Sequence, residues 1–157
     1  MSKISEGNIR VFTDAVKAYF SQAAEGEIAV DTAFLAVDGN PVCYDYTGVI
    51  SVGGDFLGCV YFSAPRVMLR HLLMTMGEAN HSEENLLDLV GEVANTFSGN
   101  AREHFGSAFA ISPPVTVKGR PDLARPDAQR SSPFVISVGW KSYSAAVVVC
   151  VHDGSKG

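Results

Sequence analysis

Strand-like segments of this chain come in blocks, and helical segments separate the blocks instead of following each strand. Strand-forming residues fill 27–37, 42–52 and 56–62, and then 111–117, 134–140 and 144–151. A parallel sheet needs a crossover connection, usually a helix, between neighbouring strands, whereas antiparallel strands need only short turns. The order therefore predicts an α+β fold, a mostly antiparallel sheet with long helices packed on one face.

Turn-forming residues support this antiparallel arrangement. Gly53-Gly54 separates two strand-like runs and supplies the positive φ angles of a tight hairpin turn. Lys141-Ser142-Tyr143 joins the last two runs in a second predicted hairpin. Ser112-Pro113-Pro114 interrupts the strand-like run 111–117, which predicts an extended segment at a sheet edge, because proline has no N–H to donate to a central strand. The stretch 119–133, which is rich in proline and charge, is predicted to be a loop.

Three segments have helical patterns. Residues 5–22 place apolar side chains on one helical stripe, and residues 65–77 begin with a proline and end with a glycine, as short helices often do. The methionines at 68, 74 and 76 are assigned to the core-facing side of this second helix. Ser82 provides an N-cap for the third helix, which is expected to run to about Phe105.

Size and composition indicate one globular domain spanning residues 1–157. Apolar residues make up 46% of the chain and charged residues 18%, a balance that excludes a mostly disordered protein. The net charge of −5 argues against a nucleic-acid partner. The polar N-terminus shows no secretory signal, and no run is long enough to cross a membrane, so a cytoplasmic protein is expected.

The cysteines and histidines give no metal or cofactor motif. Cys43, Cys59 and Cys150 lack CxxC spacing, and they are predicted to be reduced, packed thiols. The four histidines are dispersed, and the sequence contains no HExxH motif, P-loop or dinucleotide fingerprint. We therefore expect this chain to hold neither a metal ion nor a cofactor.

The predicted helix from Leu86 to Phe105 has one polar stripe opposite its apolar face. At about 100° per residue, Asp88, Glu92, Asn95 and Gly99 fall within about 60° of one another. The core side is formed by Leu86, Val90, Val93, Ala94, Phe97 and Ala101. Such a stripe is often only a solvated surface.

Two glycines distinguish this stripe from an ordinary polar helix face. An exposed glycine inside a helix costs about 1 kcal/mol relative to alanine. Gly91 and Gly99 are therefore interpreted as keeping the surface low, so that the backbone of another macromolecule can approach. The alternative is that these glycines pack beneath a neighbouring loop of the same chain.

The segment Leu89-Val90-Gly91-Glu92-Val93-Ala94-Asn95 resembles the signature helix of the CheC/CheX/FliY chemotaxis phosphatases. Their pattern is an Asp or Ser, a Glu four residues later and an Asn three residues further, which Asp88, Glu92 and Asn95 match. The resemblance extends to residues 58–63, to the following short helix and to residues 111–120. CheC-type members carry two such helices, so the single one here is more similar to CheX.

The resemblance implies a phosphatase that acts on the aspartyl phosphate of a CheY-like response regulator. Asn95 would position the attacking water, because a neutral amide approaches a phosphoryl group without charge repulsion. Glu92 would dock to the regulator's lysine, with Asp88 as a peripheral contact and Gly91 and Gly99 permitting close approach.

The resemblance also bears on cofactors and partners. The catalytic Mg²⁺ is expected on the regulator, and the chain is expected to form a homodimer through sheet edges. The alternative function is a CheC-like, non-catalytic scaffold that binds a response regulator or a flagellar motor component.

Overall fold

Seven strands and three helices account for most of the residues placed by the computed structural model, which describes residues 6–23, 28–35, 43–121 and 133–153. In chain order the elements are α1 (Glu6–Ala23), β1 (Ile28–Leu35), β2 (Tyr46–Gly54), β3 (Phe56–Ala64), α2 (Arg66–Thr75), α3 (Glu83–Phe105), β4 (Phe109–Ile111), β5 (Val115–Lys118), β6 (Phe134–Trp140) and β7 (Tyr143–Asp153).

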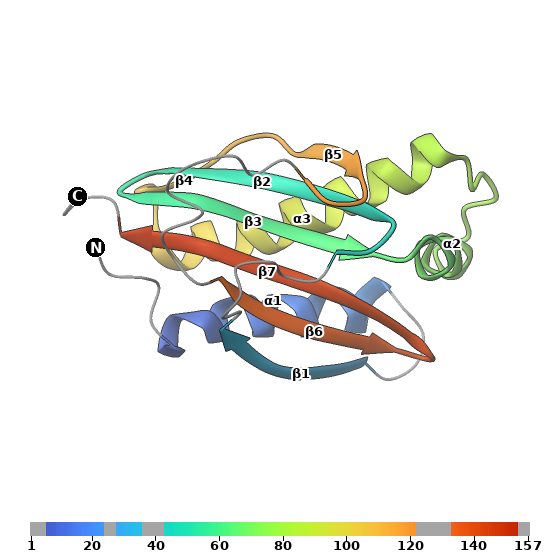
Figure 1. The fold of residues 1–157 in the computed structure, drawn as a ribbon, viewed down its shortest axis with the longest axis horizontal. Coiled ribbons are helices and arrows are strands. Elements are labelled where there is room, and N and C mark those ends of the chain that lie inside the picture. The colour runs from blue at the N-terminus through green and yellow to red at the C-terminus, as the bar shows by residue number, and fades with distance from the viewer. Residues whose placement is uncertain (1–5, 24–27, 36–42, 122–132, 154–157) are drawn as a thin grey trace.

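The strands form one sheet in the order β1-β6-β7-β3-β2-β4, and β5 also pairs with β2 (Figure 1). Every strand pair in the described residues is antiparallel. The predicted α+β class with a mostly antiparallel sheet is thereby confirmed. At the centre of the sheet β3, from the first block of strands, pairs with β7, from the second block.

Both predicted hairpins are present. Gly54 ends β2 with a φ of 86°, a conformation that glycine adopts without steric cost. The second hairpin is tighter than the sequence suggested, because Tyr143 already pairs with Trp140 and only Lys141 and Ser142 form the loop. Lys141 takes a φ of 55° there, and the two-residue connection fits the twist of the flanking strands.

The predicted extended segment after α3 lies at the outer edge of β2. It forms two short strands: β4 pairs with Val52–Gly54, and β5 pairs with Tyr46–Val49. Between them Ser112 replaces part of the ladder: its backbone N–H donates to Ser51 O at 3.0 Å, and its Oγ accepts from Ser51 N at 3.0 Å. The two prolines that follow are thus tolerated, because the edge position demands no N–H from them.

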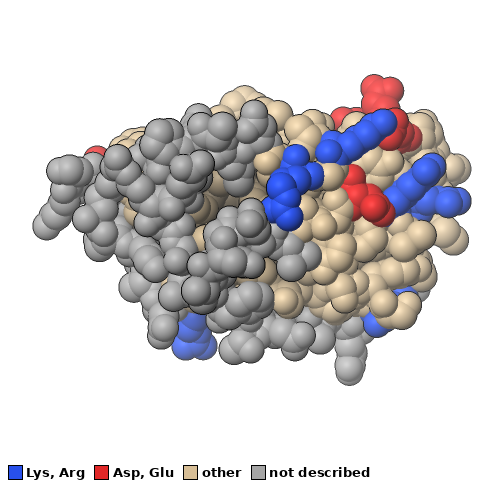
Figure 2. Space-filling view, viewed as in Figure 1, with Lys and Arg blue, Asp and Glu red and all other residues tan. Residues whose placement is uncertain are grey.

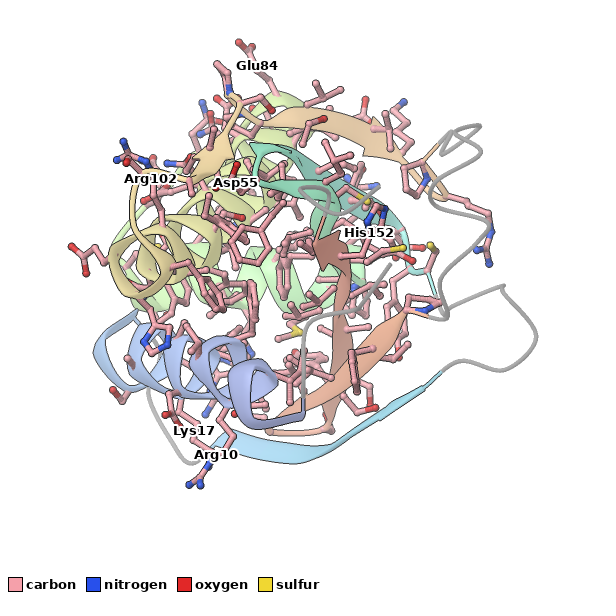
Figure 3. All side chains as sticks on the ribbon, turned by 90° about the vertical axis from the view of Figure 1, so that its left-hand side faces the viewer. Arg10, Lys17, Asp55, Glu84, Arg102 and His152 are labelled. Atoms are coloured by element: carbon pink, nitrogen blue, oxygen red, sulfur yellow. The ribbon has the colours of Figure 1, made fainter. Side chains whose placement is uncertain are left out.

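Helices α1 and α3 pack side by side on one face of the sheet, as the view along the strands shows (Figure 3). The core between these two layers includes Phe12, Phe62, Phe97 and Trp140, all fully buried. Burial of such side chains contributes about 1.5–3 kcal/mol each to folding. His152 lies on the other face of the sheet, away from the helices (Figure 3).

Helix α2 lies at one end of the molecule, beside the first turns of α3 (Figure 1). Pro65 precedes it and Gly77 follows it with a φ of 80°, as the sequence predicted. The assignment of all three methionines to the core is wrong: Met68 is buried, but Met74 and Met76 are exposed. The helix is only 10 residues long, lies beside the end of the sheet and packs chiefly against α3 (Figure 1).

None of the helices in the described ranges is both long and apolar enough to cross a membrane. No disulfide joins the cysteines at 43, 59 and 150. Cys59 and Cys150 are buried within β3 and β7, and the packed thiols predicted at these two positions are confirmed. Burial raises the pKa of the Cys150 thiol.

Candidate functional site

The candidate site is built on α3, whose two ends are fixed by local chemistry. Ser82 is the N-cap, and its Oγ accepts from Asn85 N at 3.3 Å. Acidic residues occupy the first turn, where they interact favourably with the positive end of the helix dipole. Gly106 terminates the helix with a φ of 87°, and its N–H donates to Arg102 O at 2.8 Å. The predicted boundaries of this helix are confirmed.

The predicted division of α3 into a core face and a polar stripe is also confirmed. All six residues assigned to the core are buried, and Asp88, Glu92 and Asn95 are exposed. Glu92 and Asn95 lie one turn apart, about 4.5 Å along the helix axis. In the described residues, no hydrogen bond or ion pair engages these three side chains. The acid and the amide therefore face solvent together, free to bind a partner.

One border of this stripe is formed by the strand segment that returns along β2. A Cβ atom on Gly91 would lie 2.9 Å from Thr116 Cγ2 and 3.4 Å from Pro114 Cβ. Gly91 is buried, so its interpretation as an exposed glycine that lowers the helix surface for a partner is wrong. The alternative is correct here: Gly91 lets the chain's own segment 114–116 lie close to α3.

Gly99 has different surroundings from Gly91. It is half-buried, and a Cβ atom built there would meet nothing within 4 Å. No packing inside the described chain explains a glycine at this position, and its role as a permissive partner contact stays a prediction. Further along the stripe, Arg102 points away from the sheet (Figure 3).

The other border of the stripe is formed by Tyr19 of α1, which belongs to the segment 5–22 with its predicted apolar stripe. Its ring meets Phe97 edge-on at 5.9 Å, and its hydroxyl is buried with no hydrogen-bond partner among the described residues. Burial first, and then the negative charge of Glu92, raise the pKa of Tyr19. The hydroxyl therefore stays neutral beside the carboxylate. An amphipathic pattern cannot distinguish such a residue from any other core aromatic.

A hollow of about 310 Å³ adjoins the N-terminal half of the stripe. Asp88 and Glu92 line it from α3, and Leu73, Met76 and Glu78 line it from the end of α2 and the turn that follows. Asn95 is not among the lining residues. The α2 side of this hollow was not predicted from the sequence, although methionines at the end of a short helix, next to a glycine, were a usable signal.

The described residues contain no group of three or more His, Cys, Asp or Glu side chains arranged to hold a metal ion. The chemistry that the stripe offers is an unpaired carboxylate beside a carboxamide. The carboxylate accepts hydrogen bonds and attracts a cation, whereas the amide both donates and accepts. Such a pair is suited to docking and to ordering a small polar molecule, such as water.

Several solved structures of chemotaxis proteins have the same fold as this chain. A crystal structure of CheX from Vibrio vulnificus is 19% identical, has a TM-score of 0.75, and covers 93% of this chain and 99% of that chain. CheX from Desulfovibrio desulfuricans is 17% identical with a TM-score of 0.77, covering 93% and 99%. These structures share the fold described above.

A third similar structure is a complex. It is the CheX–CheY–BeF₃–Mg²⁺ complex from Borrelia burgdorferi. The matching chain of this complex is 15% identical with a TM-score of 0.75, and the match covers 96% of the present chain and 99% of the chain in the complex. No match was found among proteins with curated descriptions.

The sequence model of one family, described as chemotaxis phosphatase CheX, matches residues 46–138. The chain belongs to the CheX chemotaxis phosphatase family. The matched region includes β2, β3, α2 and the whole of α3, and hence the exposed stripe.

Proposed function

We propose that this protein hydrolyses the aspartyl phosphate of a CheY-like response regulator. The observation that supports this most directly is the exposure of Glu92 and Asn95, which lie one turn apart on α3 and have no side-chain partner in the part of the chain that the structure describes. A related CheX chain has been crystallised with CheY, BeF₃ and Mg²⁺, which makes a phosphorylated regulator the natural partner to test.

The regulator supplies most of the electrostatic stabilisation that this reaction needs. Its Mg²⁺ and its lysine neutralise the phosphoryl group, so the missing component is an ordered water molecule. The water oxygen bonds to phosphorus while the bond from phosphorus to the aspartyl oxygen breaks. Inorganic phosphate leaves, the aspartate carboxylate is restored, and the water proton passes to a phosphate oxygen or to solvent. We expect the Mg²⁺ on the regulator and not on this chain.

Asn95 orders that water in the proposed mechanism. Its amide approaches the phosphoryl oxygens without the repulsion that a carboxylate would meet, and it both donates to and accepts from the water. Glu92 pairs with the regulator's lysine and fixes how the two proteins align. Because both side chains come from the same regular helix, their spacing is set before the regulator binds.

The test follows loss of acyl phosphate from a phosphorylated CheY-like regulator with Mg²⁺ present. Asn95→Ala is expected to keep binding but to lose about 10²-fold or more of the acceleration. Asn95→Asp, which is nearly isosteric, should lose as much, because its charge repels the phosphoryl group. Glu92→Ala should weaken both binding and turnover.

Matched controls come from the same helix. Asn100→Ala removes a half-buried amide on another side of α3, and Glu103→Ala removes an exposed carboxylate three turns from Glu92. Both controls should act like the unmodified protein. If Asn95→Ala were equally fast, the mechanism would be wrong, and binding without any acceleration by the unmodified protein would favour the scaffold function.

The proposal extends to the setting in which the protein works. A partner that is a response regulator places the protein in the cytoplasm. The homodimer implied by the family resemblance stays a prediction, which analytical ultracentrifugation tests directly.

A further inference from the structure

The hollow beside the stripe is a groove with an apolar floor and an acidic rim, and we refer to it below as the α2–α3 groove. Leu73 and Leu89 form its floor and are buried. Met76 borders it with 42% of its surface exposed, and the neighbouring Met74 is 62% exposed. Large apolar side chains left exposed beside a concave surface are typical of interaction sites.

The rim of the groove is strongly negative. Glu78, Asp88 and Glu92 line it, and no lysine or arginine does. The C-terminal end of α2 borders the groove. Helix carbonyl groups carry partial negative charge at such an end, and the last turn of α2 contains no basic residue. The groove therefore favours a positively charged ligand group.

Two basic side chains at this end of the molecule, Lys118 and His81, make their contacts with other groups. Figure 2 shows basic and acidic side chains gathered at the end of the molecule that carries α2 and the start of α3. In this region Lys118 Nζ pairs with Glu83 Oε1 at 2.7 Å, outside the groove. His81 directs its Nε2 to the Glu78 carbonyl oxygen at 2.8 Å. No ion pair in the described residues neutralises the three carboxylates of the groove.

The α2 side of the groove is held in place by its own hydrogen bonds. Glu78 N donates to Leu73 O at 2.9 Å, and Glu78 Oε1 accepts from Asn80 N at 3.0 Å. Asn85 Nδ2 on α3 donates to Asn80 O at 2.9 Å, which ties the turn to the helix. Both walls are therefore formed before a partner arrives, which lowers the entropic cost of binding.

This inference rests on the proposed function and identifies a second contact with the same partner. We propose that the α2–α3 groove binds a basic side chain of the phosphorylated regulator, while an apolar neighbour of that side chain packs on Met76. The long apolar stem of a lysine or arginine suits the leucine floor, and its charged end suits the carboxylates at the rim.

The position of this second basic side chain follows from α3. Glu92 belongs both to the acid-amide pair and to the groove, so a regulator docked over Asn95 extends across the groove. Asp88 lies about 6 Å along the axis from Glu92. The second basic group therefore sits about one helical turn from the lysine paired with Glu92.

The test compares two double variants that change the net charge equally. Glu78→Gln with Asp88→Asn removes two groove charges, and the glutamine keeps an oxygen for the Asn80 N–H. The control, Glu84→Gln with Glu103→Gln, removes two exposed carboxylates of α3 outside the groove. The probe is a CheY-like regulator from the same organism, activated with beryllofluoride and Mg²⁺, and Kd is measured at low and high salt.

The groove variant is expected to bind about tenfold more weakly at low salt, and this difference should shrink at high salt, where charges are screened. KM for dephosphorylation should rise by a similar factor. The control variant should stay within about twofold of the unmodified protein. Met76→Ala should weaken binding several-fold without this salt dependence. Urea unfolding midpoints verify that each variant is folded.

The outcomes separate the groove from the phosphatase mechanism. Equal Kd values for the groove variant, the control and the unmodified protein would overturn the groove proposal, whatever Asn95→Ala does to turnover. A groove variant that alters the sedimentation coefficient but not Kd would also overturn it, because the occupant would then be a second copy of this chain. If the unmodified protein binds the regulator without accelerating hydrolysis, the phosphatase proposal fails while the Kd comparison still tests the groove.

Discussion

The close approach of β2 to α3 at Gly48 sets the height of α3 above the sheet. A Cβ atom on Gly48 would lie 2.4 Å from Val90 O and 2.8 Å from Gly91 N. Normal contacts are about 3.5 Å or longer, so Gly48→Ala requires a separation of about 1 Å. Both opposing atoms belong to the helix backbone and cannot rotate aside, while β3 and β5 hold Gly48 from either side.

The expected destabilisation can be worked from these contacts. Overpacking a core costs about 1–3 kcal/mol, and a clash with backbone belongs at the upper end, about 3 kcal/mol. Removing a glycine from a strand interior restores about 0.5–1 kcal/mol through backbone entropy. The unfolding free energy should therefore fall by about 2 kcal/mol, which lowers Tm by roughly 4–8 °C in a domain of this size.

Urea unfolding measures this change, and Gly53→Ala is the matched control in the same strand. A Cβ atom on Gly53 would meet nothing within 4 Å, so this variant should be as stable as the unmodified protein or slightly more stable. Because Val90 and Gly91 directly precede Glu92, Gly48→Ala should also slow dephosphorylation at temperatures where it is folded. An unfolding midpoint for Gly48→Ala equal to that of Gly53→Ala would refute the reasoning.

Three further predictions concern the surroundings of the site. Gly99→Ala should raise the unfolding free energy by about 0.5–1 kcal/mol through helix propensity, but it should weaken binding of the regulator. An unchanged Kd for the regulator would show that Gly99 does not contact it. The hydrogen bond from Lys118 holds the pKa of Glu83 below its ordinary value of 4.5. The ion pair therefore stabilises the fold above pH 4.5, and this stabilisation is lost as the pH falls through the lowered pKa of Glu83. Urea midpoints of Glu83→Gln and the unmodified protein should accordingly differ at pH 6 and converge in acid. Tyr19→Phe removes a buried hydroxyl that lacks a partner among the described residues, so thermal unfolding should show a gain in stability of about 1 kcal/mol. A loss of stability would show instead that the hydroxyl donates a hydrogen bond, and Glu92 would be the acceptor to test.

The sequence predicted the fold well where periodicity and turn chemistry act locally. The 3.6-residue repeat of α3 fixed which side chains are buried, and it placed Glu92 and Asn95 on the opposite side. Glycines and prolines marked the hairpins and the edge segment, because their backbone preferences do not depend on distant residues. The second hairpin loop was predicted one residue too long, because strand pairing places Tyr143 in β7.

Features that depend on two distant segments were not predictable in this way. Gly91 and Gly99 look alike in the sequence, but the segment 114–116 covers only Gly91. Met74 and Met76 resemble core residues, but α2 packs chiefly against α3 beside the end of the sheet, and the two side chains are exposed. The groove joins residues of α2 and α3 that no repeat relates.

The sequence by itself thus determined the helix, its exposed acid and amide, and the antiparallel architecture, because these follow from the period of side chains along the chain. The tertiary structure alone decided what borders that pair: Pro114 and Thr116 on one side, Tyr19 on another, and the groove at its N-terminal end. The physical reason is that side-chain direction is a local property of a helix, whereas its neighbours depend on how the whole sheet and its helices pack.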